Sequence, residues 1–142
     1  ATRSLIRAAV SAFLDTNILI RHLTGDPRDM AGRATAYLRT ADELFLADLI
    51  VAETVYVLES FYEVQRVQVA EAMRSLLAMR SVVTLDAVVL LRAVEVYEVE
   101  RIDFAEAYLV ACAERAGVGQ IASFDRSIER VATVHRTAPP PV

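Results

Sequence analysis

The chain has 142 residues with a formal net charge of −4 at pH 7, and 55% of its residues are hydrophobic. This length predicts a single domain over residues 1–142, and the acidic balance argues against a protein that coats nucleic acid by bulk attraction. The longest apolar runs reach about ten residues and carry charges, which excludes a membrane-spanning helix, and the single cysteine excludes a disulfide framework and favours the cytoplasm.

The first half of the chain alternates strands with helices. The predicted elements are a buried strand over Val10–Leu14, helices over Asn17–Leu23 and Asp29–Thr40, a strand over Leu44–Ala47, and a helix that Asp48 caps and that runs to about Tyr62. Each strand is therefore followed directly by a helix.

The second half continues this alternation. Apolar residues recur at helical spacing within Val67–Met79 and predict an amphipathic helix. The remaining predicted elements are a strand over Ser81–Thr84, a helix over Ala87–Glu100 capped by Asp86, a helix over Asp103–Ala116 ended by Gly117, and strands over Ile121–Ser123 and Val131–Val134. Residues 137–142 are predicted to form a loose tail, so the core spans about residues 10–135.

Short apolar strands separated by helices predict an α/β fold with a mostly parallel sheet. In such folds ligands bind beyond the carboxyl ends of the strands. Asp15 and Asp125 follow predicted strands and so fall at that edge. Each of them also suits the N-cap of a following helix, so neither establishes a site by its position alone.

Further acids lie among apolar residues on predicted helices. Glu53 and Glu106 have apolar neighbours three and four positions away, which predicts that both lie on buried helix faces. Asp103, three residues before Glu106, falls on the same side of the helix. Together they also fit a capping box, and that alternative stays open.

A buried unpaired carboxylate costs several kcal/mol or takes up a proton, whereas several can stay ionised around a divalent cation. Mg²⁺ and Mn²⁺ prefer hard oxygen ligands, and one or two such ions can activate a water and neutralise a scissile phosphate. The pattern therefore predicts a metal-dependent nuclease. Its candidate catalytic and metal-binding residues are Asp15, Glu53, Asp103, Glu106 and Asp125.

The order of four short motifs resembles that of PIN domains, and in particular of the VapC toxins of type II toxin–antitoxin pairs. The motifs are Phe-Leu-Asp-Thr-Asn at 13–17, Ala-Glu-Thr at 52–54, Asp-Phe-Ala-Glu-Ala-Tyr-Leu-Val-Ala at 103–111 and Ser-Phe-Asp at 123–125. The resemblance covers about residues 10–135. It implies a PIN-like three-layer α/β/α sandwich with a mostly parallel central sheet.

The resemblance also implies an activity, that of a Mg²⁺- or Mn²⁺-dependent endoribonuclease. It makes Asp15 the first acid, Glu53 the second and Asp125 the fourth. The third is Asp103 or Glu106, because Glu106 stands where an Asp is usual in the family. The supporting polar residues beside these acids are Thr16, Asn17 and Ser123.

Partners follow from the same resemblance. Such toxins are usually homodimers, neutralised by an antitoxin protein whose C-terminal segment crosses the active-site groove. The apolar residues of the predicted helices at 17–23 and 29–40 offer a surface for these contacts.

Two other readings of this resemblance remain, a catalytically inactive PIN-like interaction module and a PIN nuclease outside toxin–antitoxin systems. Haloacid dehalogenase-type phosphotransferases and receiver domains are excluded, because both need a lysine and this chain has none.

Overall fold

The computed structural model describes residues 11–142, in which short strands and helices alternate as predicted. The helices are α1 (Thr16–Thr24), α2 (Arg28–Thr40), α3 (Asp48–Ser60), α4 (Arg66–Leu77), α5 (Ala87–Val99), α6 (Phe104–Ala116) and the 3₁₀ helix η2 (Arg126–Arg130). The strands are β1 (Ser11–Phe13), β2 (Glu43–Phe45), β3 (Val82–Val83), β4 (Gln120–Ala122) and β5 (His135–Thr137). None of the helices in this part of the chain is both long and apolar enough to cross a bilayer.

Capping residues explain several helix boundaries. The Asp15 carboxylate accepts a hydrogen bond from the backbone N–H of Thr16 at the start of α1, and Asp86 accepts two backbone bonds at the start of α5. Gly25 and Gly117 end α1 and α6 with φ angles of 72° and 71°, a left-handed conformation that glycine adopts without steric cost. The sequence thus fixes these helix ends locally.

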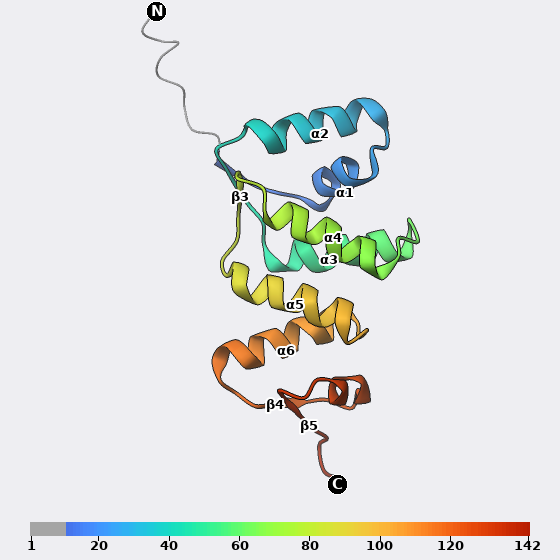
Figure 1. Ribbon diagram of the computed structural model, residues 1–142, viewed down its shortest axis with the longest axis vertical. Coiled ribbons are helices and arrows are strands. Elements are labelled where there is room, and N and C mark those ends of the chain that lie inside the picture. Colours follow the sequence, from blue (N-terminus) through green and yellow to red (C-terminus); the bar gives the residue numbers. More distant parts are fainter. Residues whose placement is uncertain (1–10) are drawn as a thin grey trace, which may run out of the picture.

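All strand pairs are parallel, which confirms the predicted α/β class, but the strands belong to two sheets. The first sheet has the order β1–β2–β3, and β4 pairs with β5 in a second one. Helices α1 and α2 lie on one side of the first sheet and α3 and α4 on the other, so this part forms the predicted α/β/α arrangement (Figure 1).

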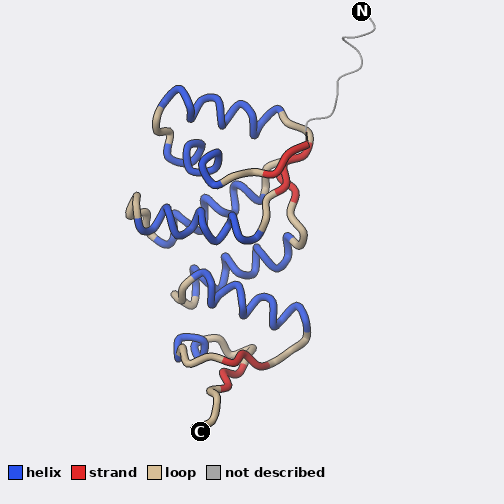
Figure 2. Tube along the Cα trace, turned by 180° about the vertical axis from the view of Figure 1, so that it is seen from behind, coloured by secondary structure: helices blue, strands red, loops and turns tan. Residues whose placement is uncertain are grey.

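The molecule is elongated, because α5 and α6 extend the stack of helices away from the first sheet (Figure 1). Strands β4 and β5 lie at the end of the stack opposite α1 and α2, and the reverse view shows the same separation of the two sheets (Figure 2). Buried apolar side chains from all the helices, including η2, nevertheless form one connected core. The predicted central sheet is therefore divided, while the core is continuous.

The last strand lies later than predicted, at His135–Thr137 instead of Val131–Val134. Val131 and Val134 are buried as apolar residues should be, but they occupy a turn closed by a bond from the Val134 N–H to the Val131 carbonyl. Burial alone therefore does not make a strand. Because Thr137 belongs to β5, the segment without regular structure begins one residue later than expected.

Asp48 does not cap α3, contrary to the prediction. Ala47 holds the N-cap position and makes no side-chain bond, while Asp48 is the first helical residue. Its Oδ2 accepts a short hydrogen bond from the hydroxyl of Tyr108, which lies on α6. Asp48 therefore ties two helices together.

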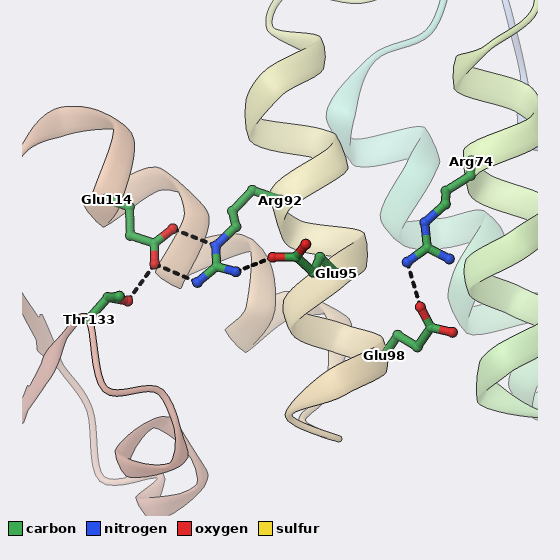
Figure 3. A network of polar contacts seen from close by, with 6 residues as sticks. All are labelled: Arg74, Arg92, Glu95, Glu98, Glu114 and Thr133. Carbon is green, nitrogen blue, oxygen red and sulfur yellow. Dashed lines mark hydrogen bonds and ion pairs between the residues drawn. The ribbon is translucent and has the colours of Figure 1, made fainter.

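A charged network holds α5 against its neighbours (Figure 3). The guanidinium of Arg92 on α5 donates from Nε and Nη2 to the two carboxylate oxygens of Glu114 on α6, at 2.7 and 2.9 Å, and also contacts Glu95. Thr133, in the turn before β5, donates to the same Glu114 carboxylate. The turn, α6 and α5 are thereby joined through one carboxylate.

We expect the Arg92–Glu114 pair to contribute stability that depends on pH. Arg92, and then Thr133, hold the pKa of Glu114 below its ordinary value, so this contribution is complete above the unfolded-state pKa and is lost as pH falls through the folded-state pKa. Arg92→Gln should therefore lose less stability than the parent protein between neutral pH and about pH 3. Urea unfolding at both pH values measures the difference.

The control is Arg80→Gln, which changes an exposed arginine outside this network. It should keep the parental pH dependence. Equal acid sensitivity of the parent protein and Arg92→Gln would show that the pair adds no pH-dependent stability.

Candidate active site

The predicted site acids are more exposed than expected. Asp15, Glu53, Asp103 and Asp125 are exposed and Glu106 is half-buried, so the prediction of buried helix faces is wrong for Glu53 and only partly right for Glu106. The apolar neighbours that suggested burial of Glu53 include Leu49 and Tyr56, which are themselves 75% and 65% exposed. These side chains form an apolar surface around the acid instead of a core.

Asp15 lies in the turn between β1 and α1, two residues beyond the strand, as predicted. Its Oδ1 accepts a 2.8 Å bond from the backbone N–H of Thr16, and this bond fixes the carboxylate at the helix start. Thr16 itself is 4% exposed, and its hydroxyl oxygen is buried without a hydrogen-bond partner among the described residues. Thr16 thus offers an unused polar atom beside the first acid.

Glu53 and Asn17 line one pocket between α1 and α3, called the Glu53 pocket below. It has a volume of about 290 Å³ and is also lined by Thr16, Arg21, Asp26, Phe61 and Tyr62. Phe61 is 81% exposed, and Tyr62 is also exposed. The pocket therefore combines acids, an amide and a cation with two accessible aromatic rings.

Asp103 and Glu106 line a second pocket, called the Glu106 pocket below. It has a volume of about 520 Å³ between α3 and the start of α6, and Tyr56, Glu59 and Ser60 of α3 also line it. Asp103 stands at the N-cap position of α6 without a side-chain capping bond, so the structure does not support the capping-box alternative. Both acids line the same pocket beside α3, in agreement with the prediction that their spacing puts them on one side of the helix.

Asp125 follows β4 of the distant second sheet and stands at the start of η2. Its Oδ1 accepts a 2.9 Å bond from the backbone N–H of Ser127, and its own N–H donates to the Ser123 hydroxyl, also at 2.9 Å. The bond from Ser127 holds the pKa of Asp125 below its ordinary value, and the charges of Arg130 and Arg136 act in the same direction. Ser123 therefore positions the backbone of the last acid.

The structure thus brings the predicted residues together in three places. Asp15, Thr16, Asn17 and Glu53 gather around α1 and α3, and Asp103 and Glu106 face α3 from the start of α6. Ser123 and Asp125 lie between β4 and η2, and β4 is at the end of the molecule opposite α1 (Figure 1). Within residues 11–142, no three acidic, histidine or cysteine side chains lie close enough to hold a metal ion. In this arrangement the donor set does not fit the divalent ion that the resemblance implies.

Sequence reasoning missed several residues of these pockets. Phe61 and Tyr62 fall at a helix end without a motif. Glu59 was also missed, and its carboxylate accepts a 2.8 Å bond from the hydroxyl of Tyr97. A pair of adjacent aromatic residues at the end of a predicted helix was the one signal available, and it does not reveal exposure.

Comparisons with known proteins find similarity over most of the chain. A crystal structure of VapBC2 from Rickettsia felis bound to a DNA fragment from their promoter matches at 13% identity, with a TM-score of 0.37, over 91% of this chain and 98% of that one. No curated protein matches this sequence. The model of the PIN domain matches residues 12–134, most of the chain. This chain therefore belongs to the PIN domain family.

Proposed function

We propose that this chain is an endoribonuclease that acts in the cytoplasm as the toxin of a toxin–antitoxin pair. The observation that best supports the proposal is the composition of the Glu53 pocket. There Glu53 and Asn17 meet Arg21 and two accessible aromatic rings, next to Asp15. Single-stranded RNA carries the matching groups, which are phosphates and unpaired bases.

Each kind of side chain in this pocket has a distinct role in the proposal. The guanidinium of Arg21 binds a phosphate oxygen through a charge-assisted hydrogen bond. Phe61 and Tyr62 stack on unpaired bases of the RNA. The carboxylates of Asp15 and Glu53 orient the attacking water and accept its proton.

PIN-domain nucleases generally use divalent metal ions, and the proposed dependence on Mg²⁺ or Mn²⁺ rests on that membership. The acids of residues 11–142 do not surround an ion as they are arranged. No step of the reaction is therefore assigned to a metal, and the roles above belong to the side chains.

The surface of α1 and α2 supports an antitoxin as the partner. A groove of about 340 Å³ is lined by Ile18, Arg21, Met30, Arg33, Ala34 and Tyr37. Its apolar side chains with arginines among them suit an amphipathic segment. Arg21 lines both this groove and the Glu53 pocket, so a segment in the groove would reach the acids and could place an Arg of its own among them.

The separation of the acids favours a second candidate, a PIN-like interaction module without activity. An RNA cleavage assay distinguishes the nuclease from the interaction module. The purified chain is incubated with labelled single-stranded RNA in Mg²⁺ or Mn²⁺ and then with excess chelator. The nuclease should produce fragments only with metal, and the protein encoded beside it should block cleavage. Intact RNA at every metal concentration would contradict the nuclease and support the interaction module.

Removing an aromatic ring from the pocket should weaken RNA binding. Because base stacking on an aromatic side chain contributes about 1–3 kcal/mol per base, Phe61→Ala should raise the Kd for a single-stranded RNA by roughly 5- to 150-fold. Fluorescence anisotropy with a labelled oligonucleotide measures this Kd. Val99→Ala, which shortens an exposed apolar residue on α5, is the matched control and should bind as the parent does. Equal affinities in both variants would exclude stacking on Phe61.

The third acid can be identified by Mn²⁺ titration of two variants. Glu106→Ala should weaken Mn²⁺ binding by about tenfold or more, since even outer-shell losses have effects of that size. Asp103→Ala should weaken it less. Asp103→Ala should also lower the free energy of unfolding by less than the about 0.5–2 kcal/mol that loss of an N-cap residue costs, because Asp103 makes no capping bond.

Glu59→Gln is the control for that titration, because Glu59 lines the same pocket but is bonded to Tyr97. It should keep the parental affinity. A larger loss in Asp103→Ala than in Glu106→Ala would reverse the assignment.

A further inference from the structure

The groove between α1 and α2, called the α1–α2 groove below, is a positive site on an acidic protein. Of the side chains that line it, Arg21 and Arg33 carry charge and the others carry none. Residues 16–40, which include both helices, contain four arginines and two aspartates, so their formal charge is +2, whereas that of the whole chain is −4. The two aspartates, Asp26 and Asp29, are not among the residues that line the groove. A negatively charged ligand is therefore favoured here.

Arg21 and Arg33 have no carboxylate partner within residues 11–142. Four other arginines pair with carboxylates in the same part of the chain, namely Arg74, Arg92, Arg115 and Arg136. Arg21 is half-buried, and the one acceptor that the described residues offer its guanidinium is the sulfur of Met30, 2.9 Å from Nη1. A thioether is a weak acceptor, so a carboxylate that reached this guanidinium would form a stronger, charge-assisted hydrogen bond.

The α1–α2 groove is preformed. His22 of α1 and Thr35 of α2 share a side-chain hydrogen bond of 2.8 Å. Leu19 and Leu38, one from each helix, are fully buried, and so is Ala34, which lines the groove. Because these contacts fix the two helices against each other, a ligand does not have to order the surface that it binds. Among the described elements, α2 is the outermost at its end of the molecule, so a partner can approach it (Figure 1).

The uncharged side chains of the groove favour a protein segment over RNA. Ile18 is half-buried, while Met30 and Tyr37 are 37% and 38% exposed, so apolar area is available to a ligand. Single-stranded RNA is bound by aromatic rings on which successive bases stack. Among the described residues that line this groove, Tyr37 is the only aromatic one. Mostly aliphatic side chains around two arginines suit the apolar face of an amphipathic segment instead.

We propose that the α1–α2 groove binds an acidic amphipathic segment of a partner protein. Carboxylates of the segment pair with Arg21 and Arg33, and its apolar side chains contact Met30 and Tyr37. Met30, Arg33 and Tyr37 follow one another at helical spacing and so share one face of α2. The segment must therefore present apolar and acidic side chains close together. Charge complementarity selects this occupant, because a basic segment would meet two unpaired cations here.

Binding of such a segment would also regulate the Glu53 pocket, a consequence that rests on the proposed function. Arg21 lines that pocket as well as the α1–α2 groove, and in the proposed function it binds an RNA phosphate. A carboxylate bonded to Arg21 neutralises this cation and adds a negative charge beside the pocket, so the phosphate loses its partner. This mode of inhibition needs no basic side chain among the acids.

Matched peptides test the docking without reference to activity. Three labelled peptides of about 15 residues, roughly four helical turns, share one face of Leu and carry Glu, Gln or Lys at the remaining positions. Fluorescence anisotropy with the full chain measures the Kd of each peptide. The Glu peptide should bind at least about tenfold more tightly than the Gln peptide, because hydrogen bonds to charged groups are the stronger ones. Since the whole chain is acidic, bulk charge favours the Lys peptide, and a Glu peptide that binds no better than either of the others would overturn the proposal.

Substitution of the arginines locates the binding site. Arg21→Gln should weaken binding of the Glu peptide by about tenfold or more, because this guanidinium is half-buried. Arg33→Gln, at an exposed position, should weaken it by about 1.5- to 5-fold. Arg28→Gln is the matched control, because Arg28 is exposed on the same helix as Arg33 but is not among the residues that line the groove. Losses no larger than that of the control would place the peptide elsewhere and overturn the proposal.

Charge reversal separates a lost contact from a damaged fold. A chain with both Arg21→Glu and Arg33→Glu should prefer the Lys peptide to the Glu peptide, a result that unfolding cannot produce. Thermal unfolding shows whether this chain is folded, and if it is not, Arg33→Glu alone takes its place. A folded variant that keeps the parental preference for the Glu peptide would contradict the docking.

Competition with RNA tests the regulation. A labelled single-stranded RNA oligonucleotide bound to the parent protein should be displaced by the Glu peptide. Because this peptide contains no Arg, its effect cannot come from an Arg placed among the acids. A Glu peptide that binds in the groove but leaves the Kd of the RNA unchanged would contradict regulation through Arg21. If Arg33→Gln weakens RNA binding as much as peptide binding, the groove is an RNA site and the proposal is wrong.

These measurements separate failure of the docking from failure of the proposed function. A parent protein that cuts no RNA contradicts the nuclease, and the peptide affinities then decide the docking by themselves. A parent protein that cuts RNA but binds all three peptides equally keeps the nuclease and contradicts the docking.

Discussion

Asp15→Asn and Asp125→Asn are each expected to lower the rate of RNA cleavage by about 10²- to 10⁴-fold, the size of effect that loss of a proton-transfer group produces. In the proposed nuclease Asp15 helps to orient and deprotonate the attacking water, and Asp125 is the fourth acid of the family's motifs, which supplies negative charge to the site. An amide of the same shape keeps the hydrogen-bond acceptor and loses the charge. Single-turnover cleavage of a labelled RNA measures the change.

Neither substitution should unfold the protein. Asp15 accepts a capping bond from Thr16 and Asp125 accepts one from Ser127, and Asn is about as good an N-cap residue as Asp. The charge lost at Asp125 weakens its attraction to Arg130 and Arg136, but this carboxylate is on the surface, where such attraction is screened. Thermal unfolding should therefore stay close to that of the parent.

Asp86→Asn is the matched control, because Asp86 also caps a helix with its carboxylate but lies outside the proposed site. It should cleave RNA at the parental rate. If Asp15→Asn or Asp125→Asn cleaves as fast as this control, the carboxylate concerned has no part in catalysis.

The helices could be predicted from the sequence because their signals are local. The helix predicted over Asp29–Thr40 is observed over Arg28–Thr40, and the one predicted over Ala87–Glu100 ends one residue earlier, at Val99. A capping carboxylate at Asp86 and a glycine at Gly117 act within one turn of the chain. Such boundaries need no knowledge of the tertiary structure.

The division of the sheet could not be predicted. Strands of two or three residues contain too little pattern to specify a neighbour, and their pairing depends on where the connecting helices pack. Here the contacts that place α6, such as the bond from Tyr108 to Asp48, join residues far apart in the sequence. They decide where β4 lies.

The positions of the candidate acids were predicted in part, and their roles stay a prediction. The strand and helix pattern placed Asp15, Glu53 and Asp125 on the elements where the structure has them, and Asp103 and Glu106, three residues apart, line one pocket. The predicted burial of Glu53 is wrong because its apolar neighbours, such as Tyr56, are themselves exposed. A helix that is apolar on several sides does not reveal from its sequence which side faces solvent.

Tyr97→Ala is expected to cause the largest loss of stability, about 3–5 kcal/mol, the range for removing a buried aromatic ring. Tyr97 is 1% exposed on α5 and packs edge-on against Phe104, with ring centroids 5.9 Å apart. The guanidinium of Arg66 lies over its ring, 4.4 Å from the centroid. The cavity left by alanine would remove both contacts together with the buried area.

The hydroxyl of Tyr97 makes a smaller contribution that a second variant isolates. It donates a 2.8 Å bond to Glu59 of α3, and burial, followed by the nearby Glu59, raises the pKa of Tyr97, so the hydroxyl stays protonated and able to donate. Tyr97→Phe keeps the ring and loses this bond, which should cost about 0.5–1.5 kcal/mol. Urea unfolding of both variants gives the two values.

The order of these two losses tests how α5 is held in the fold. Arg66 donates hydrogen bonds to the carbonyls of Tyr97 and Ile102, at 2.8 and 2.7 Å. Helix α4 therefore holds the end of α5 and the following loop through these hydrogen bonds as well as through the contact between the Arg66 guanidinium and the Tyr97 ring. If packing dominates, Tyr97→Ala should lower the thermal midpoint by on the order of 10 °C, several times the effect of Tyr97→Phe. Equal losses would mean instead that the hydrogen bond from Tyr97 to Glu59, and not the buried ring, holds α5 in place, and with it α6 and the second sheet.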